Sequence, residues 1–338
     1  MITFRKLCAA LAVCLAGGGA QAQDLHFSQF FQAPLTRNPA LAGIFTGDIR
    51  VQALYRDQWN SVTTAYRTTS LSGEYKMPIG KADDFLTLGG QVLYDQAGTV
   101  SWKTTHIMPA VNYHKSLSTE VNRYLSVGFM GGIVQSRIDR SKVQTSDWYN
   151  TGGGDGEASL NPKATYVDMA TGVSFNTQWR QKSEDNLFVA VAYHHFNRPK
   201  RSFFNDASAD LQPKLVFSGG LRFSVTEASY LNLQGDFSKQ AQFQESMIGV
   251  LYGLKIGPEL DNPRYTLHGG AFIRWNDAVV PVIKLDYHPF SFSFSYDVNI
   301  SKLKTSSQGR GGFEVGITYI GKNKRREEMK GVIFCPKY

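Results

Sequence analysis

The residues of this chain that are best suited to acid–base or metal chemistry are its seven histidines. Imidazole exchanges protons near neutral pH and binds transition metals. The histidines are scattered, none stands in a His-Glu-x-x-His arrangement, and the adjacent His194 and His195 would face opposite sides of a strand. No Gly-x-Ser-x-Gly motif marks a nucleophilic serine, and the glycine-rich residues 152–156 lack the Lys-Ser/Thr pair of a phosphate loop. The sequence therefore predicts no catalytic residue, no metal site and no cofactor, and it favours a binding protein over an enzyme, with a Ser–His hydrolase as a less favoured alternative.

The start of the chain has the composition of a secretory signal peptide. Arg5 and Lys6 form a positive beginning, an apolar run follows at 7–15, and Ala20-Gln21-Ala22 fits a cleavage site. We expect residues 1–22 to be removed on export. A lipoprotein signal ending at Cys14 is the alternative. The formal charge of +8 suits an acidic partner or lipid, and export argues against nucleic acid.

Beyond residue 22 no stretch approaches the roughly 20 apolar residues that a membrane helix needs. Alternation of apolar and polar residues is frequent instead. In the segment 290–298, Phe290, Phe292, Phe294 and Tyr296 alternate with serines and an aspartate. Successive side chains of a strand point to opposite faces, so this segment separates an apolar from a polar surface. We expect these aromatic side chains to face lipid and Ser291, Ser293 and Ser295 to face the lumen of a barrel.

The same pattern recurs along the chain and predicts about fourteen antiparallel strands of a transmembrane β-barrel spanning 48–321. Many of these segments reach the roughly 9–11 residues that a tilted membrane strand needs. Outer-membrane barrels alternate short periplasmic turns with longer outer loops. The expected connections follow that tendency, with the longest, 139–163 and 199–212, on the outer side. The expected strands are 48–58, 63–76, 85–96, 102–116, 123–138, 164–179, 186–198, 213–225, 229–240, 243–257, 263–276, 278–289, 290–300 and 311–321.

Two segments lie outside the predicted strands and contain apolar residues that something must cover. The segment 23–47 is rich in prolines and aromatic residues and shows no alternation. The tail 322–338 is basic, contains Cys335 and continues past the last strand. Apolar surface left in water is costly. We therefore expect both segments to lie in the periplasm and to pack together at the barrel mouth. We expect Cys335 to be shielded by the barrel mouth or by a partner.

These termini also carry a resemblance to a known family. The motifs are His26-Phe-Ser-Gln-Phe30, Asn38-Pro-Ala-Leu-Ala-Gly43, Tyr55-Arg-Asp-Gln-Trp59, Tyr296-Asp-Val-Asn-Ile-Ser301, Gly311-Gly-Phe-Glu314 and Cys335-Pro-Lys-Tyr338. Together they resemble the PorP/SprF family over almost the whole mature chain. Family members usually end in Cys-Pro-Arg-Phe, so the lysine here loses bidentate pairing with a carboxylate.

The resemblance implies a non-enzymatic outer-membrane component of type IX protein secretion and gliding motility. It implies two kinds of partner: a secreted, adhesin-like client with a C-terminal sorting domain, and other secretion or motility components in the periplasm or outer membrane. Outer-membrane lipid is a further expected partner. A channel for small or hydrophobic solutes is the alternative function. The expected partner-binding residues are His26, Phe27, Phe30, Asn38, Pro39, Gly43, Lys324, Arg325, Arg326, Cys335, Pro336 and Tyr338.

Overall fold

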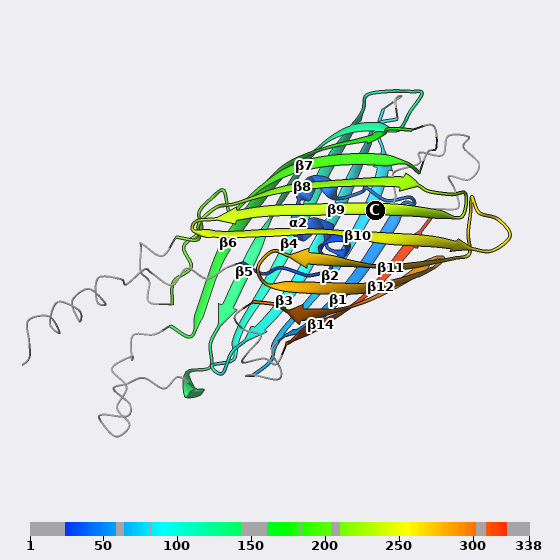
Figure 1. Ribbon diagram of the computed structural model, residues 1–338. Coiled ribbons are helices and arrows are strands. Elements are labelled where there is room, and N and C mark those ends of the chain that lie inside the picture. Colours follow the sequence, from blue (N-terminus) through cyan, green and yellow to red (C-terminus); the bar gives the residue numbers. More distant parts are fainter. Residues whose placement is uncertain are drawn as a thin grey trace, which may run out of the picture.

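The protein is a closed barrel of fourteen antiparallel strands, in which each strand pairs with its neighbours in sequence and β1 pairs with β14 (Figure 1). The computed structural model describes residues 24–58, 64–80, 83–142, 161–180, 182, 184–203, 210–301 and 309–322. The strands are β1 (Ile49–Gln58), β2 (Tyr66–Pro78), β3 (Phe85–Ala97), β4 (Trp102–Ser116), β5 (Arg123–Arg137), β6 (Lys163–Gln178), β7 (Asn186–His194), β8 (Lys214–Ser224), β9 (Ser229–Gln240), β10 (Phe243–Ile256), β11 (Tyr265–Arg274), β12 (Ala278–Tyr287), β13 (Phe290–Asn299) and β14 (Arg310–Gly321).

All fourteen predicted strands are present, and most of their ends agree to within two residues. The largest difference is β7, which we expected to reach residue 198 and which ends at His194. The chain turns immediately afterwards because His195 and Arg198 have positive φ angles of 55° and 43°. The predicted fold class is therefore confirmed, and the long outer connection after β7 begins earlier than expected.

The two faces of the wall differ as the alternation predicted. In β13 the side chains of Phe290, Phe292 and Phe294 are exposed on the outside, whereas Ser293 and Ser295 are buried on the inside. Tyr296 is on the outer face and is half-buried. An apolar exterior over a polar interior is the arrangement that a barrel in lipid requires.

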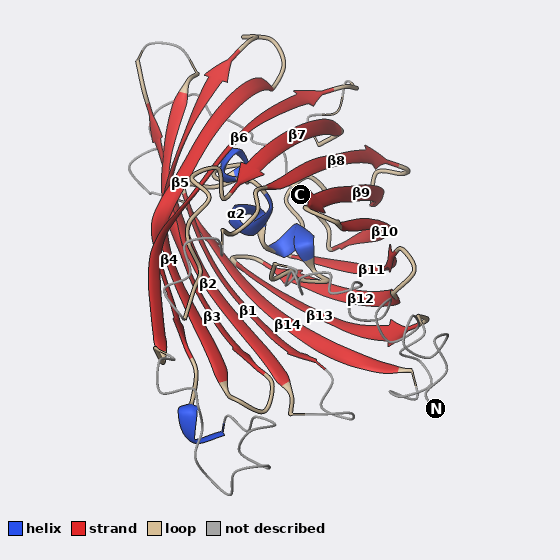
Figure 2. Ribbon diagram, turned by 90° about the vertical axis from the view of Figure 1, so that its left-hand side faces the viewer, coloured by secondary structure: helices blue, strands red, loops and turns tan. Residues whose placement is uncertain are grey.

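The N-terminal segment, which we expected at the periplasmic mouth, lies inside the barrel. It forms three short helices, η1 (Phe30–Gln32), α2 (Pro34–Arg37) and η2 (Pro39–Leu41), which lie within the ring of strands (Figure 2). A proline begins both α2 and η2, where its missing N–H costs nothing. We call residues 24–47 the plug. The apolar side chains that needed cover are covered by the inner wall, since Leu35, Ala40 and Leu41 are almost completely buried.

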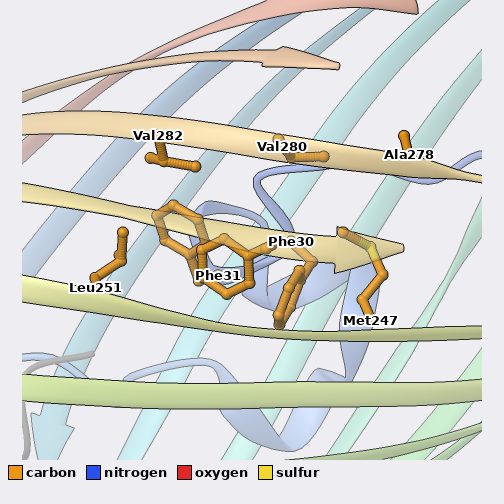
Figure 3. Close-up of a cluster of buried hydrophobic side chains, with 8 residues drawn as sticks. Phe30, Phe31, Met247, Leu251, Ala278, Val280 and Val282 are labelled. Atoms are coloured by element: carbon orange, nitrogen blue, oxygen red, sulfur yellow. The ribbon is translucent and has the colours of Figure 1, made fainter. Parts of the chain in front are cut away.

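The largest apolar cluster of the lumen joins the plug to strands β10, β11 and β12. Phe30 and Phe31 lie against Met247, Leu251 and Val280 (Figure 3). Phe31 also stacks on Phe272, with ring centroids 5.2 Å apart. Further clusters join Leu35 to β4, β5 and β6, and Leu41 to β7. No helix in the described ranges is both long and apolar enough to cross a membrane. The core of this protein is therefore the interface between plug and wall.

Candidate functional site in the lumen

The plug is bound on every side of the lumen. Each of the fourteen strands has an inward-facing residue that pairs with a plug residue, packs closely against one or shares an apolar cluster with one. In order from β1 to β14 these wall residues are Arg56, Glu74, Gln91, Asn112, Gly128, Ser174, His194, Lys214, Asp236, Glu245, Arg274, Val280, Asp297 and Glu314. The described plug therefore spans the cross-section of the barrel.

The first part of the plug is held by buried charges. Glu314 on β14 accepts hydrogen bonds from the backbone N–H groups of Ser28 and Gln29, at 2.6 and 2.7 Å. The hydroxyl of Ser28 donates to Asp297 on β13 at 2.9 Å. A carboxylate that is removed from water is stable only when it is paired and hydrogen-bonded. The two carboxylates therefore need cations close by.

Two arginines of the wall supply those cations. Arg56 on β1 lies 3.3 Å from both Glu314 and Asp297 and donates to the backbone carbonyl of His26. Arg274 on β11 lies 2.9 Å from Asp297 and donates to the Ser28 hydroxyl at 2.9 Å. We call Arg56, Arg274, Asp297 and Glu314 the charged anchor. Its two cations and two anions balance, and the backbone of residues 26–29 completes the hydrogen bonding.

A second group of charges holds the first described residue of the plug. His195 lies between two carboxylates, 2.8 Å from Asp168 and 3.1 Å from Asp24, and Lys214 lies 3.7 Å from Asp24. Burial disfavours the imidazolium, but Asp24 and Asp168 outweigh it and raise the pKa of His195 to about 9. Burial likewise opposes ionisation of Asp24, but His195 and Lys214 hold the pKa of Asp24 well below its usual value. Both groups are therefore charged at neutral pH.

His26, unlike His195, is surrounded mainly by positive charges. Burial and the positive charges of Arg56 and Arg274 hold the pKa of His26 well below its usual value. Its ring lies 3.5 Å from Glu245 on β10. The imidazole is therefore neutral at physiological pH, and it contributes packing and hydrogen bonding rather than charge.

The second part of the plug is held mainly by neutral groups. Asn112 on β4 donates to the carbonyls of Ala40 and Ala42, both at 2.8 Å, and Ser174 on β6 donates to the Ala40 carbonyl at 2.9 Å. Gly128 on β5 allows the plug to approach closely, because a Cβ at this position would lie 2.4 Å from the nitrogen of Ala40. We call Asn112, Gly128 and Ser174 the neutral anchor.

Two motif residues give this part of the plug its shape. The side chain of Asn38 accepts a hydrogen bond from the Ala40 N–H at 2.7 Å and so caps η2. Gly43 has a φ of +81°, which favours glycine, and its N–H donates to Glu74 at 2.7 Å. Between the two anchors, Arg37 of α2 forms two hydrogen bonds to Asp236 at 2.8 and 2.5 Å.

The structure brings together six of the residues that we expected to bind a partner. His26, Phe27, Phe30, Asn38, Pro39 and Gly43 all lie in the plug, and only His26 keeps a sizeable exposed fraction, 24% of its side chain. In this structure they bind the wall of their own barrel. The other six, Lys324, Arg325, Arg326, Cys335, Pro336 and Tyr338, lie outside the described residues, as do the signal peptide and the expected contact between the two termini. A role for these twelve residues in binding a partner stays a prediction.

The wall residues that hold the plug were not predicted from the sequence. Arg56, Asp297 and Glu314 stood in the motifs that carry the family resemblance, but nothing in a single strand shows that they converge. One available signal was the segment 278–283, where both alternating faces are apolar. Val280 and Val282 point inward and are buried, which identifies a lumen filled by protein rather than water.

Among the described residues, no group of three or more histidine, cysteine, aspartate or glutamate side chains could hold a metal ion. Many polar groups of the lumen instead bind the plug. The arrangement is that of a site for a peptide segment of the same chain.

The comparisons with known proteins agree with the architecture. The family described as type IX secretion system membrane protein PorP/SprF matches residues 19–319. No curated protein matches the chain. The toluene transporter TbuX of Ralstonia pickettii is similar in structure, with a TM-score of 0.50 at 9% identity over 88% of this chain and 95% of the transporter.

Two further solved structures are also similar. The translocator domain of the autotransporter NalP from Neisseria meningitidis gives a TM-score of 0.45 at 12% identity, covering 93% of this chain and 97% of that domain. CdiB from Acinetobacter baumannii gives a TM-score of 0.46 at 10% identity over 80% of this chain, which spans 60% of the length of CdiB. At these identities the likeness concerns the barrel fold alone.

A closed fourteen-stranded barrel with an apolar exterior and a polar, plug-filled lumen is an integral β-barrel protein of the outer membrane. The family match then gives the particular class. The chain belongs to the PorP/SprF family and is a membrane component of the type IX secretion system, where it works with other parts of the secretion machinery.

Proposed function

We propose that this protein is a non-enzymatic anchor that holds, or helps to export, a secreted surface protein with a C-terminal sorting domain. The observation that carries the proposal is the plug, which pairs with or packs against the wall on all fourteen strands. A barrel that is filled in this way offers its rims and tail to a partner and keeps its lumen closed. The adhesin-like nature of the client follows from the family resemblance.

The tail supplies the partner-binding surface in this proposal. Lys324, Arg325 and Arg326 are cations for an acidic partner or for lipid headgroups, and Cys335, Pro336 and Tyr338 extend the surface. The plug residues His26, Phe27, Phe30, Asn38, Pro39 and Gly43 keep the barrel closed in this proposal.

The first experiment measures ion conductance of the purified protein in planar bilayers. We expect the full chain to stay closed and a variant lacking residues 24–45 to conduct, provided that it still shows heat-modifiable gel migration. A variant lacking residues 323–338 is the matched control and should remain closed. Steady conductance of the full chain would favour the alternative, a channel for small or hydrophobic solutes.

The second experiment tests the anchor itself. The full chain and the variant lacking residues 323–338 are purified from detergent-solubilised outer membranes, and co-purifying proteins are identified by mass spectrometry. We expect the truncated barrel to insert normally and to lose a secreted protein with a C-terminal sorting domain. Retention of that protein at the level of the full chain would contradict the role of the tail.

A further inference from the structure

Three cations lie side by side on the outer surface of the barrel. Lys103 on β4 is directly opposite Arg137 on β5, and Arg137 is directly opposite Lys163 on β6. All three side chains are exposed on the outer face. Directly opposite residues of an antiparallel pair have Cβ atoms about 5 Å apart, and like charges in these positions are destabilising. We call Lys103, Arg137 and Lys163 the cation row.

The row has no neutralising partner in the part of the chain that the structure describes, where its three side chains form no ion pair. A further cation in the same line of paired strand residues does have a partner. Arg67 on β2 lies in line with the row through Gln96, and Arg67 forms an ion pair with Asp57 at 3.3 Å. Asp139, which lies close to the end of β5 in the chain, is paired with Lys142 at 3.7 Å. An external anion would therefore relieve the repulsion within the row.

Along the strands, the outer surface beside the cation row becomes first polar and uncharged, and then apolar. The next outward-facing register line consists of Thr105, Gln135 and Thr165, which are polar and uncharged. The line after that consists of Ile107, Ile133 and Val167, whose exposed fractions are 56%, 55% and 49%. Each step is about 7 Å along the strand. The three lines thus place cations, then hydrogen-bonding groups, then an apolar surface in the order in which a lipid places its phosphate, its linking groups and its acyl chains.

The row lies at the outer end of the barrel. Lys103 follows the β3–β4 turn, and Arg137 and Lys163 flank the 25-residue connection between β5 and β6. The two connections at the opposite end of these strands are both shorter than this 25-residue connection, since residues 117–122 join β4 to β5 and residues 179–185 join β6 to β7. Outer-membrane barrels carry their long loops on the outer side. The row therefore lies at the level of the outer-leaflet headgroups.

We propose that the outer surface of β4, β5 and β6 binds an anionic, phosphate-bearing lipid of the outer leaflet, through Lys103, Arg137 and Lys163. The guanidinium of Arg137 binds two phosphate oxygens, and the flanking ammonium groups neutralise the remaining charge. The lipid is favoured over free phosphate because the apolar line beneath the row is contacted by acyl chains. It is favoured over an acidic protein segment because such a segment would meet lipid along the same line.

The test uses the full chain in dodecyl maltoside micelles with dimyristoyl phosphatidic acid as the probe. Native mass spectrometry measures bound lipid for the wild type and for the triple variant K103Q, R137Q and K163Q. The matched control is the triple variant K200Q, K239Q and R264Q, which removes the same charge and the same residue types at isolated exposed positions. We expect the row variant to lose at least about tenfold in lipid binding and the control to bind as the wild type does.

Thermal unfolding gives a second readout that does not depend on lipid counting. In neutral detergent the row variant should unfold at the same temperature as the wild type or higher, because repulsion is removed. Added phosphatidic acid should raise the midpoint of the wild type and the control but not that of the row variant. Equal lipid retention by the row variant, equal retention of dimyristoyl phosphatidylcholine, or complete displacement by inorganic phosphate would overturn the proposal.

Discussion

The two anchors of the plug hold neighbouring parts of one segment by different physics. The charged anchor binds residues 26–29 through buried carboxylates and arginines, so its strength depends on ionisation. The neutral anchor binds residues 39–42 through amide and hydroxyl donors and through close approach at Gly128. Breaking one partner of a buried ion pair leaves an uncompensated charge, whereas loss of a neutral hydrogen bond costs far less. The start of the plug should therefore be the part that responds to charge and pH.

Trypsin provides one readout for both anchors. Arg37 is the only lysine or arginine within residues 24–47, and its side chain is buried in the lumen. Cleavage after Arg37 therefore requires the plug to open locally. The rate of this cleavage, together with heat-modifiable gel migration of the barrel, separates release of the plug from unfolding of the wall.

The largest effect is expected for Glu314→Gln. The amide cannot accept both N–H groups as a carboxylate does, and Arg56 is left with one counter-ion. We expect a destabilisation of about 3–5 kcal/mol, as for other broken buried ion pairs. The free energy of plug opening is measured from the urea dependence of trypsin cleavage at Arg37. Glu259→Gln removes the same charge from an exposed turn and should change the free energy by less than about 0.5 kcal/mol. Equal effects of the two substitutions would contradict the charged anchor.

The second prediction concerns pH. The pKa of His195 is raised to about 9 in the folded protein, above its unfolded value of about 6.5. The stabilisation is therefore fully present below pH 6.5 and is lost as the pH rises through 9. A difference of this size corresponds to roughly 3 kcal/mol. We expect cleavage at Arg37 to accelerate between pH 7 and pH 9.5 in the wild type.

The matched variant for this prediction is His195→Gln, which cannot carry the charge. Its cleavage rate, corrected for the pH dependence of trypsin on a denatured substrate, should change little over the same range. A pH dependence of the variant as steep as that of the wild type would assign the effect to another group.

The third prediction tests the neutral anchor by shape. Gly128→Ala places a Cβ 2.4 Å from the backbone of Ala40, so the plug must shift. Overpacking of this kind costs about 1–3 kcal/mol. The control is Gly73→Ala on β2, where nothing lies within 4 Å of the added atom. The loss of free energy of plug opening caused by Gly128→Ala should be the same at pH 7 and pH 9.5. A loss that varies with pH would contradict the assignment of this anchor to neutral contacts.

The smallest effect is expected for Ser174→Ala. The Ala40 carbonyl loses one donor but keeps Asn112, so the cost should be about 1 kcal/mol. Ser218→Ala serves as the reference, because the buried hydroxyl of Ser218 has no hydrogen-bond partner within the described part of the chain. Urea titration of the two variants side by side measures the difference. If Ser218→Ala were the more damaging, the hydrogen bond to Ala40 would not be stabilising.

The sequence predicted the wall of the barrel better than it predicted the contents. Strand positions follow from period-2 alternation, which is a property of each segment by itself, and so the outward direction of Phe294 could be predicted. The need to cover Phe30, Leu35 and Leu41 could also be predicted. The surface that covers them could not, because their partners come from strands up to about 250 residues away and alternation carries no information on long-range pairing.

The charged anchor was hidden for the same reason. Arg56, Asp297 and Glu314 each look like an ordinary polar residue on the inner face of a strand. Their convergence depends on closure of the barrel, which places β1 beside β14 and brings Arg56 opposite Glu314. Register across the closing seam is set by the whole ring of strands, and no local pattern specifies it.

The span of the charged anchor along the chain has a consequence for biogenesis. Ser28 and Glu314 are 286 residues apart, so one of the first segments to be exported binds a side chain of the last strand. A chain that ends before β14 lacks the carboxylate that receives the plug. Completion of the plug therefore depends on delivery of the entire polypeptide to the outer membrane.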